Sequence, residues 1–290
     1  MPAGRLIVRP GLPLVPKDVR AAIDVAARRL GGDYDEDEWG FDEGFLEAVD
    51  PVLRFLYERW WRVKTVGAER VPAHGRALLC ANHAGVLPWD ATMMATGLQK
   101  EAPLPRWPRF LVLNYAFELP FASVAIRKIG GVPASPHNAT RLLESEHLVM
   151  VFPEGAKGTG KAWSERYRVG RFGRGGFVEL ALRTGSPIVP CAVVGSEEIY
   201  PKIGELRGLA RLLGAPYMPI TPTFPLLGPL GFVPLPSRWR IEFGDPIDLS
   251  SYGAEAADDQ NLVLEIAETV RERVQAMVYE NLVRREGAFA

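Results

Sequence analysis

The chain has 290 residues, 47% of them hydrophobic and 24% charged, with a formal net charge of −1. This length is enough for one large domain or two small ones with a sizeable core, and the composition is typical of a soluble globular protein. The nearly balanced charge gives no indication of a polyanionic partner, so a nucleic-acid-binding function is not expected.

Residues 1–64 are predicted to form an N-terminal helical region. The segment 17–30 has the pattern of a short amphipathic helix, and two glycines end it before an acidic stretch at 33–38, which we interpret as a solvated linker. A second helix is expected over 43–63, with its apolar residues on one face. The tryptophan pair at 60–61, next to basic residues, suits a membrane interface, and packing of this helix on the domain core is the alternative.

From residue 65 to residue 250, short apolar runs alternate with helical stretches. This alternation predicts an α/β domain with a central, mostly parallel mixed sheet flanked by helices. Ser135 and Pro136 are expected to begin one helix, and Gly185 to end another. Strands are expected at 77–81, 110–113, 148–152, 188–194 and 239–243, and helices at 91–98, 117–128, 136–146 and 174–184.

The C-terminal part, 251–290, contains a helix expected at 260–283, whose apolar face indicates that it packs on the core. Upstream of it, the stretch 212–237 has no charged residue, but its seven prolines exclude a membrane-spanning helix.

Cys80 and Cys191 lie inside apolar runs, which predicts buried free thiols. The start of the chain has an apolar patch that is too short for a secretory signal peptide.

His83 and Asp90 are the first candidates for chemistry. His83 directly follows an expected strand, and Asp90 opens the next helix. If the residues between them form a turn, the carboxylate can hold one ring nitrogen protonated and leave the other free as a base. In the alternative interpretation, Asp90 only caps the helix and His83 is a turn residue.

Glu154 follows another expected strand, within Pro-Glu-Gly. Because sites in open α/β sheets lie at the carboxyl ends of strands, this carboxylate is expected in the same crevice as His83, where it could bind an acceptor hydroxyl or orient the base. A surface turn is the alternative.

The loop 155–161 also has the spacing of a phosphate-binding loop, although Ala162 stands where that motif needs Ser or Thr to hold magnesium. Basic residues between 157 and 174 indicate either a site for a phosphorylated ligand or a solvated face.

Other catalytic templates do not fit the chain. The Gly-Ser-Glu at 195–197 lacks the spacing of a nucleophile elbow. Four histidines and two cysteines show no zinc-ligand spacing, and no dinucleotide fingerprint follows the first strand, so neither a metal nor a cofactor is expected.

Taken in order, these motifs resemble the phospholipid/glycerol acyltransferase superfamily, which includes the 1-acylglycerol-3-phosphate O-acyltransferases. The Phe-Pro-Glu-Gly block matches closely, with Lys157 where the family usually has arginine. A Pro-Ile-Val-Pro block follows some thirty-five residues later, and that combination is specific. The resembling stretches are 82–90, 130–143, 151–158, 186–195 and a terminal Gly-Asp-Pro-Ile at 244–247.

The resemblance implies an O-acyltransferase. His83 would deprotonate an acceptor hydroxyl, and Asp90 would orient the imidazole. The alkoxide would then attack the thioester of acyl-CoA or acyl carrier protein, the co-substrate. The partners would be this donor, a glycerolipid or lysophospholipid acceptor and a membrane surface, with the protein peripheral on the inner, cytoplasmic face of the cell membrane. The residues expected to bind substrate are Glu154, Gly155, Lys157, Asn82 and Gly85.

Two departures from the family pattern refine this prediction. Six residues separate His83 from Asp90 where the family usually has four, as in the branch that resembles monoacylglycerol and diacylglycerol acyltransferases. The second resembling block, at 130–143, lacks the arginine that the family usually has there, at the positions equivalent to 132–135. This absence favours a neutral or differently decorated acceptor. For an acyltransferase, the stretch 212–237 would dip into a membrane or line an acyl tunnel, and a buried crossing of the core is the alternative. Nucleotide binding through 155–161 and non-catalytic lipid binding are the alternative functions.

Overall fold

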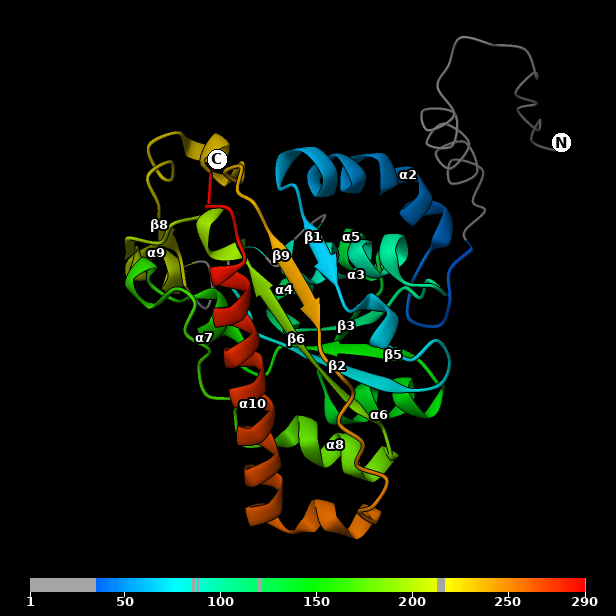
Figure 1. Ribbon diagram of the computed structural model, residues 1–290. Coiled ribbons are helices and arrows are strands. Elements are labelled where there is room, and N and C mark those ends of the chain that lie inside the picture. The colour runs from blue at the N-terminus through cyan, green and yellow to red at the C-terminus, as the bar shows by residue number, and fades with distance from the viewer. Residues whose placement is uncertain (1–34, 85–86, 88, 119–121, 213–216, 290) are drawn as a thin grey trace, which may run out of the picture.

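The structure is a computed structural model that describes the chain except for residues 1–34, 85–86, 88, 119–121, 213–216 and 290 (Figure 1). The expected helix at 17–30 and the candidate Gly85 lie outside the described residues, and the domain boundaries at 64/65 and 250/251 stay predictions.

A seven-stranded sheet forms the centre, in the order β1-β9-β6-β2-β5-β3-β4. Five strands run parallel, β9 runs antiparallel to β6, and β1 pairs parallel with β9. The mostly parallel mixed sheet and the α/β class are therefore confirmed. The strands are β1 (Lys64–Val66), β2 (Ala77–Ala81), β3 (Arg109–Val112), β4 (Gly131–Pro133), β5 (Leu148–Val151), β6 (Ile188–Val194) and β9 (Arg240–Phe243); β7 (Gly204–Glu205) and β8 (Pro219–Ile220) form a separate hairpin.

All five expected strands are present within a residue or two of their predicted bounds, whereas β1 and β4 were not predicted. Both have only three residues, too few to show a periodicity, and they lie at the two outer positions of the sheet. The expected helix at 117–128 corresponds to the end of α4 and to α5. The helices are α2 (Glu43–Phe55), α3 (Trp89–Glu101), α4 (Asn114–Glu118), α5 (Ala122–Lys128), α6 (Pro136–Glu144), α7 (Ala156–Thr159), α8 (Gly176–Thr184), α9 (Arg207–Leu212) and α10 (Gln260–Val283).

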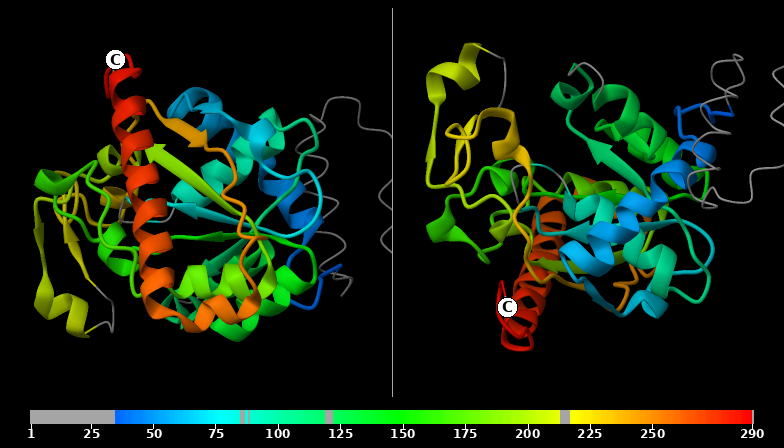
Figure 2. Two further views of the ribbon diagram at one scale, coloured as in Figure 1. Left: turned by 60° about the horizontal axis from the view of Figure 1, so that its bottom comes forward. Right: turned by 90° about the horizontal axis from the view of Figure 1, so that it is seen from above.

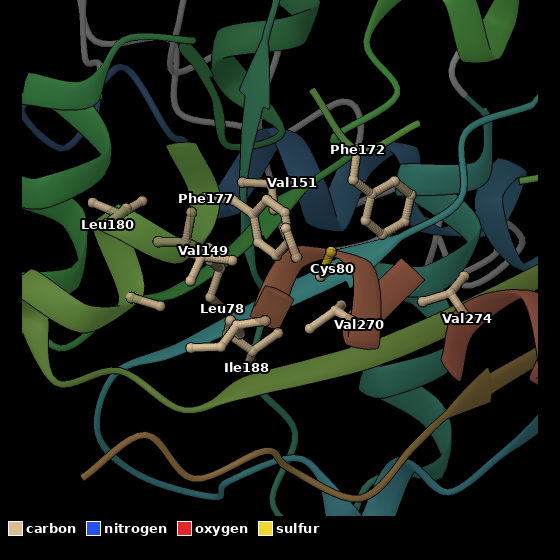
Figure 3. Packing of buried hydrophobic residues seen from close by; sticks show 14 of the residues in the cluster. Leu78, Cys80, Val149, Val151, Phe172, Phe177, Leu180, Ile188, Val270 and Val274 are labelled. Carbon is tan, nitrogen blue, oxygen red and sulfur yellow. The ribbon is translucent and has the colours of Figure 1, made fainter. Parts of the chain in front are cut away.

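Two hydrophobic cores cover the two faces of the sheet. Side chains alternate along β2, so Leu78 and Cys80 belong to the core formed with α6, α8 and α10 (Figure 3), while Leu79 and Ala81 belong to the core formed with α2 and α3. Figure 1 shows these helices on the two faces of the sheet. The predicted apolar face of α10 is buried in the first core. Both cysteines are buried free thiols, as predicted.

Local signals begin and end several helices as expected. The hydroxyl of Ser135 accepts a hydrogen bond from the backbone of Asn138, with Pro136 at the first position of α6. Gly185 ends α8 in the left-handed conformation, at φ 61°. The side chain of Trp61 is fully buried between Trp89 and Trp239, so the core-packing alternative holds for this residue.

The described acidic residues of 35–38 are exposed, in agreement with a solvated segment, but three of them also form ion pairs with later elements. Glu36 forms an ion pair with Lys128, Asp37 with Arg109, and Glu38 with Arg141. The three carboxylates thus tie the segment to α5, β3 and α6. These ion pairs were not predicted, because composition alone does not reveal that cations of later elements lie along the path of an acidic segment. Among the described helices, none combines the length and apolarity needed to cross a bilayer.

Candidate active site

Three neighbouring strands deliver polar side chains to one edge of the sheet. β6, β2 and β5 are adjacent and parallel, so their carboxyl ends lie together. Asn82 and His83 follow β2, and Glu154 follows β5. The amide of Asn82 donates to the carbonyl oxygen of Val193 at 2.9 Å and accepts from its N–H at 2.8 Å. These bonds fix the end of β2 against β6, and a contact between Asn82 and substrate stays a prediction.

His83 and Asp90 come together despite the six residues between them. The Nδ1 atom of His83 lies 2.6 Å from Oδ2 of Asp90, whose side chain is fully buried. The same oxygen accepts a hydrogen bond from the backbone of Ala84, and the His83 ring stacks on Phe152 with centroids 4.3 Å apart. Because a carboxylate only accepts, the neutral form of this imidazole carries its proton on Nδ1 and has its lone pair on Nε2. This arrangement can remove a proton from a hydroxyl group.

Glu154 is buried and its carboxylate is bonded on several sides. Oε1 accepts from the backbone N–H of His83 at 2.9 Å, and Oε2 accepts from the N–H of Gly170 at 2.6 Å. The Lys161 ammonium lies 2.8 Å from Oε2. Glu154 therefore holds the histidine backbone in place, and direct binding of an acceptor by Glu154 stays a prediction.

The loop after Glu154 folds back beneath the histidine. Gly155 turns the chain at φ 57°, and the short helix α7 follows. Lys161, the lysine of the phosphate-loop spacing, is engaged by Glu154. Lys157 is exposed, so its predicted contact with substrate stays untested.

A cavity of about 550 Å³ begins at His83 and runs beneath the carboxyl ends of β5 and β3. Figure 2 (right) shows β3 with α4 and α5 on one side and the segment around β7, α9 and β8 on the other, both standing out beyond the sheet. The cavity lies between these two parts and has a mainly apolar lining, which suits an alkyl chain. The lining includes Phe110, Leu111, Leu113, Tyr115, Ala134, Val151, Phe177, Tyr217, Met218 and Phe232.

The charge-free stretch 212–237 contributes to this cavity and to the surface. Tyr217, Met218 and Phe232 line the cavity, and burial raises the pKa of Tyr217 to about 12. Leu226 and Leu230 are 84% and 69% exposed. This part of the stretch is therefore not a buried crossing of the core.

Sequence reasoning missed Glu197 and Glu198, which follow β6 at the same sheet edge as His83. Both are buried. The signal was available, because two glutamates follow a long apolar strand after a Gly-Ser pair, but the Gly-Ser-Glu motif was considered only as a nucleophile elbow. Lys161 was considered as the lysine of a phosphate loop and as part of a basic cluster, without its partner.

Comparisons with known proteins agree with this architecture. A family model described as Acyltransferase matches residues 62–194. Uncharacterized proteins of Mycobacterium tuberculosis and Mycobacterium bovis are each 50% identical over 272 residues, covering 93% of this chain and 76% of the relative. The crystal structure of the 1-acyl-sn-glycerophosphate (LPA) acyltransferase PlsC from Thermotoga maritima superposes with a TM-score of 0.55 at 17% identity. That alignment covers 93% of this chain and 96% of PlsC, which shows a shared fold.

Proposed function

Because the chain belongs to the phospholipid/glycerol acyltransferase superfamily, we propose that it transfers a fatty acyl group from an acyl thioester to the hydroxyl group of a glycerolipid or lysophospholipid. The observation that carries this proposal is the His83–Asp90 pair at one end of a large apolar cavity. A hydroxyl at Nε2 and an acyl chain in the cavity would bring both reactants together.

In the proposed reaction, Nε2 of His83 takes the hydroxyl proton as the oxygen attacks the thioester carbonyl carbon. Asp90 holds Nδ1–H and stabilises the imidazolium that forms. When the tetrahedral intermediate collapses, the carbon–sulfur bond breaks and the imidazolium returns its proton to the thiolate. The products are the ester and the free thiol of coenzyme A or acyl carrier protein.

We propose that the acceptor carries no phosphate group at the place where the usual arginine of the second block, 130–143, would bind one. Ala134 lines the cavity, and Val132 is buried in the core, so this part of the chain presents an alanine to the cavity instead of an arginine. A neutral or differently decorated lipid fits such a surface better than a phosphomonoester.

We further propose that the protein works as a peripheral protein at a membrane surface, on its cytoplasmic side. The exposed leucines of 226–230 belong to the same segment as Met218 and Phe232, which line the cavity. A lipid could then pass from the bilayer into the cavity without exposing its chain to water.

The test is acyl transfer from radiolabelled acyl-CoA to extracted lipids by the native chain and by His83→Ala, with His137→Ala as the matched control, because His137 lies exposed on α6. The expected result is loss of transfer in His83→Ala alone. Equal transfer by the native chain and His83→Ala would overturn the role of the base. Lipid that co-purifies, with no turnover of acyl-CoA or acyl carrier protein donors, would instead favour a non-catalytic lipid-binding protein.

A further inference from the structure

Two adjacent buried glutamates occupy the short helix Ser196–Glu198, directly after β6. Glu198 is well partnered: its carboxylate accepts from the hydroxyl of Tyr167 and lies 2.7 Å from the guanidinium of Arg285. Glu197 differs from its neighbour. Neither of its carboxyl oxygens accepts a hydrogen bond of good geometry from the described residues, although the backbone amides of Glu197 and Tyr167 lie near enough to favour its charged form.

Glu197 lines a second, small cavity beside the active site. Its volume of about 20 Å³ is room for one water molecule, too little for a lipid headgroup. Burial, and then the charge of Glu198, raise the pKa of Glu197 to about 7, while Lys161 acts in the opposite direction. The other charged or titratable groups on the cavity wall are Lys161, Arg166, Lys202 and Tyr200.

Lys161 connects this cavity to the catalytic histidine. Its ammonium lies 2.8 Å from Oε2 of Glu154, whose Oε1 accepts the backbone N–H of His83 at 2.9 Å. The remaining cations on the cavity wall have partners of their own: Lys202 donates to the carbonyl of Gly160, and Arg166 to that of Trp163. The Lys161 ammonium, paired with Glu154, is therefore the cation on this wall whose charge also acts on Glu197.

We propose that Glu197 is a positioning residue of the active site, which competes with Glu154 for the ammonium group of Lys161 and thereby controls the hydrogen bond that fixes His83. When Glu197 is neutral, Lys161 stays with Glu154 and the His83 backbone is held. When Glu197 is ionised, an unpaired buried charge is costly, so the ammonium is drawn toward the small cavity and the support of His83 weakens. The catalytic consequence rests on the acyl transfer proposed above, whereas the charge coupling does not.

The coupling can be measured without any substrate. The N–H of Gly170 donates to Oε2 of Glu154 at 2.6 Å, so its amide resonance reports the state of that carboxylate. In protein labelled with ¹⁵N-glycine, we expect the Gly170 resonance to shift with a midpoint near pH 7 in the native chain, in agreement with the pKa of Glu197. The shift should vanish in Glu197→Gln and persist in Glu198→Gln with a lower midpoint, because the charge of Glu198 raises the pKa of Glu197. A parallel series carrying His83→Ala removes the titration of the imidazole from the signal.

The same variants test the catalytic consequence through the pH dependence of kcat/KM. The native chain should lose activity above pH 7, by up to tenfold per pH unit, and Glu197→Gln should keep its activity there. Glu198→Gln should begin to lose activity at a lower pH than the native chain, because it removes a charge that raises the pKa of Glu197. An unchanged Gly170 titration in Glu197→Gln overturns the proposal, as does a pH profile of Glu197→Gln that superimposes on the native one. If the native chain transfers no acyl group, the proposed function fails, and the Gly170 titration still decides whether the charge coupling exists.

Discussion

Gly158 lies so close to His83 that a Cβ atom on residue 158 would be 2.7 Å from the Cβ of His83 and 2.9 Å from its carbonyl oxygen. These distances are too short for any side chain, and the second one involves backbone, which cannot rotate away. We therefore expect Gly158→Ala to displace the histidine from Asp90. A displacement of about 1 Å in a catalytic group costs roughly 100-fold in rate, so kcat should fall by about that factor in the acyl-transfer assay.

The matched control is Gly208→Ala, because Gly208 lies exposed on α9 with nothing within 4 Å of the added Cβ. This variant should transfer acyl groups at the native rate. If Gly158→Ala were also fully active, the close packing of α7 beneath His83 would not matter for the reaction.

The pair of Glu154 and Lys161 gives a second prediction, for stability. Lys161→Met leaves the buried carboxylate of Glu154 without its cation, and breaking a buried pair in this way costs about 3–5 kcal/mol in the free energy of unfolding. The double variant Glu154→Gln/Lys161→Met removes both charges and should recover most of that loss. Urea unfolding of both single variants and the double variant measures the coupling, and purely additive effects would contradict it.

Much of this site was predictable because its residues follow long apolar runs. β2 and β5 are fully buried strands, and their apolar runs indicate a parallel sheet. They also indicate the edge of that sheet at which His83 and Glu154 lie. The contact between His83 and Asp90 was a hypothesis at that stage, since a turn of six residues has no fixed path. The roles of Lys161 and Gly158 depend on how the loop after Glu154 folds back, and local sequence does not encode that path.

The fold was predictable to a similar extent, and for the same reason. The bounds of a long strand such as β6 match the ends of its apolar run in the sequence. β1, in contrast, is exposed at two of its three positions, so its sequence resembles that of a loop. The ion pairs of residues 36–38 join positions more than seventy residues apart, so nothing near them in the sequence reveals them.

A third prediction concerns the length of the acyl chain. Ala134 lines the apolar cavity just after β4, two strands away from the strand that precedes Glu154. We expect Ala134→Trp to fill this part of the cavity, so that transfer of long acyl groups falls at least tenfold while short acyl groups react normally. The measurement is kcat/KM over a series of acyl-CoA lengths, with Ala134→Ser as the control. A uniform loss across all lengths would exclude this end of the cavity from binding the chain.

The exposed leucines of the charge-free stretch give a fourth prediction. Each leucine that enters a bilayer contributes about 1.5–3 kcal/mol, so Leu226→Ser/Leu230→Ser should bind liposomes at least tenfold more weakly than the native chain. Co-sedimentation with vesicles of phosphatidylcholine and phosphatidylglycerol measures this binding. Leu264→Ser is the control, because Leu264 is an exposed leucine near the start of α10. Equal weakening by the control would point to a general loss of apolar surface.

The pH dependence of stability provides a fifth prediction, centred on Glu197. Its pKa is raised from 4.5 to about 7 in the folded chain, chiefly by burial, so the folded state binds this proton more tightly than the unfolded state. The contribution of Glu197 to stability is therefore fully present below pH 4.5, falls between pH 4.5 and 7, and by pH 8 has dropped by on the order of 3 kcal/mol. Glu197→Gln cannot ionise, so its free energy of unfolding should rise relative to the native chain across that window. Urea unfolding at several pH values measures the difference, and Glu198→Gln should move the window to lower pH, because it removes a charge that raises the pKa of Glu197. A constant difference between Glu197→Gln and the native chain over the whole range would show that this carboxyl group does not titrate there.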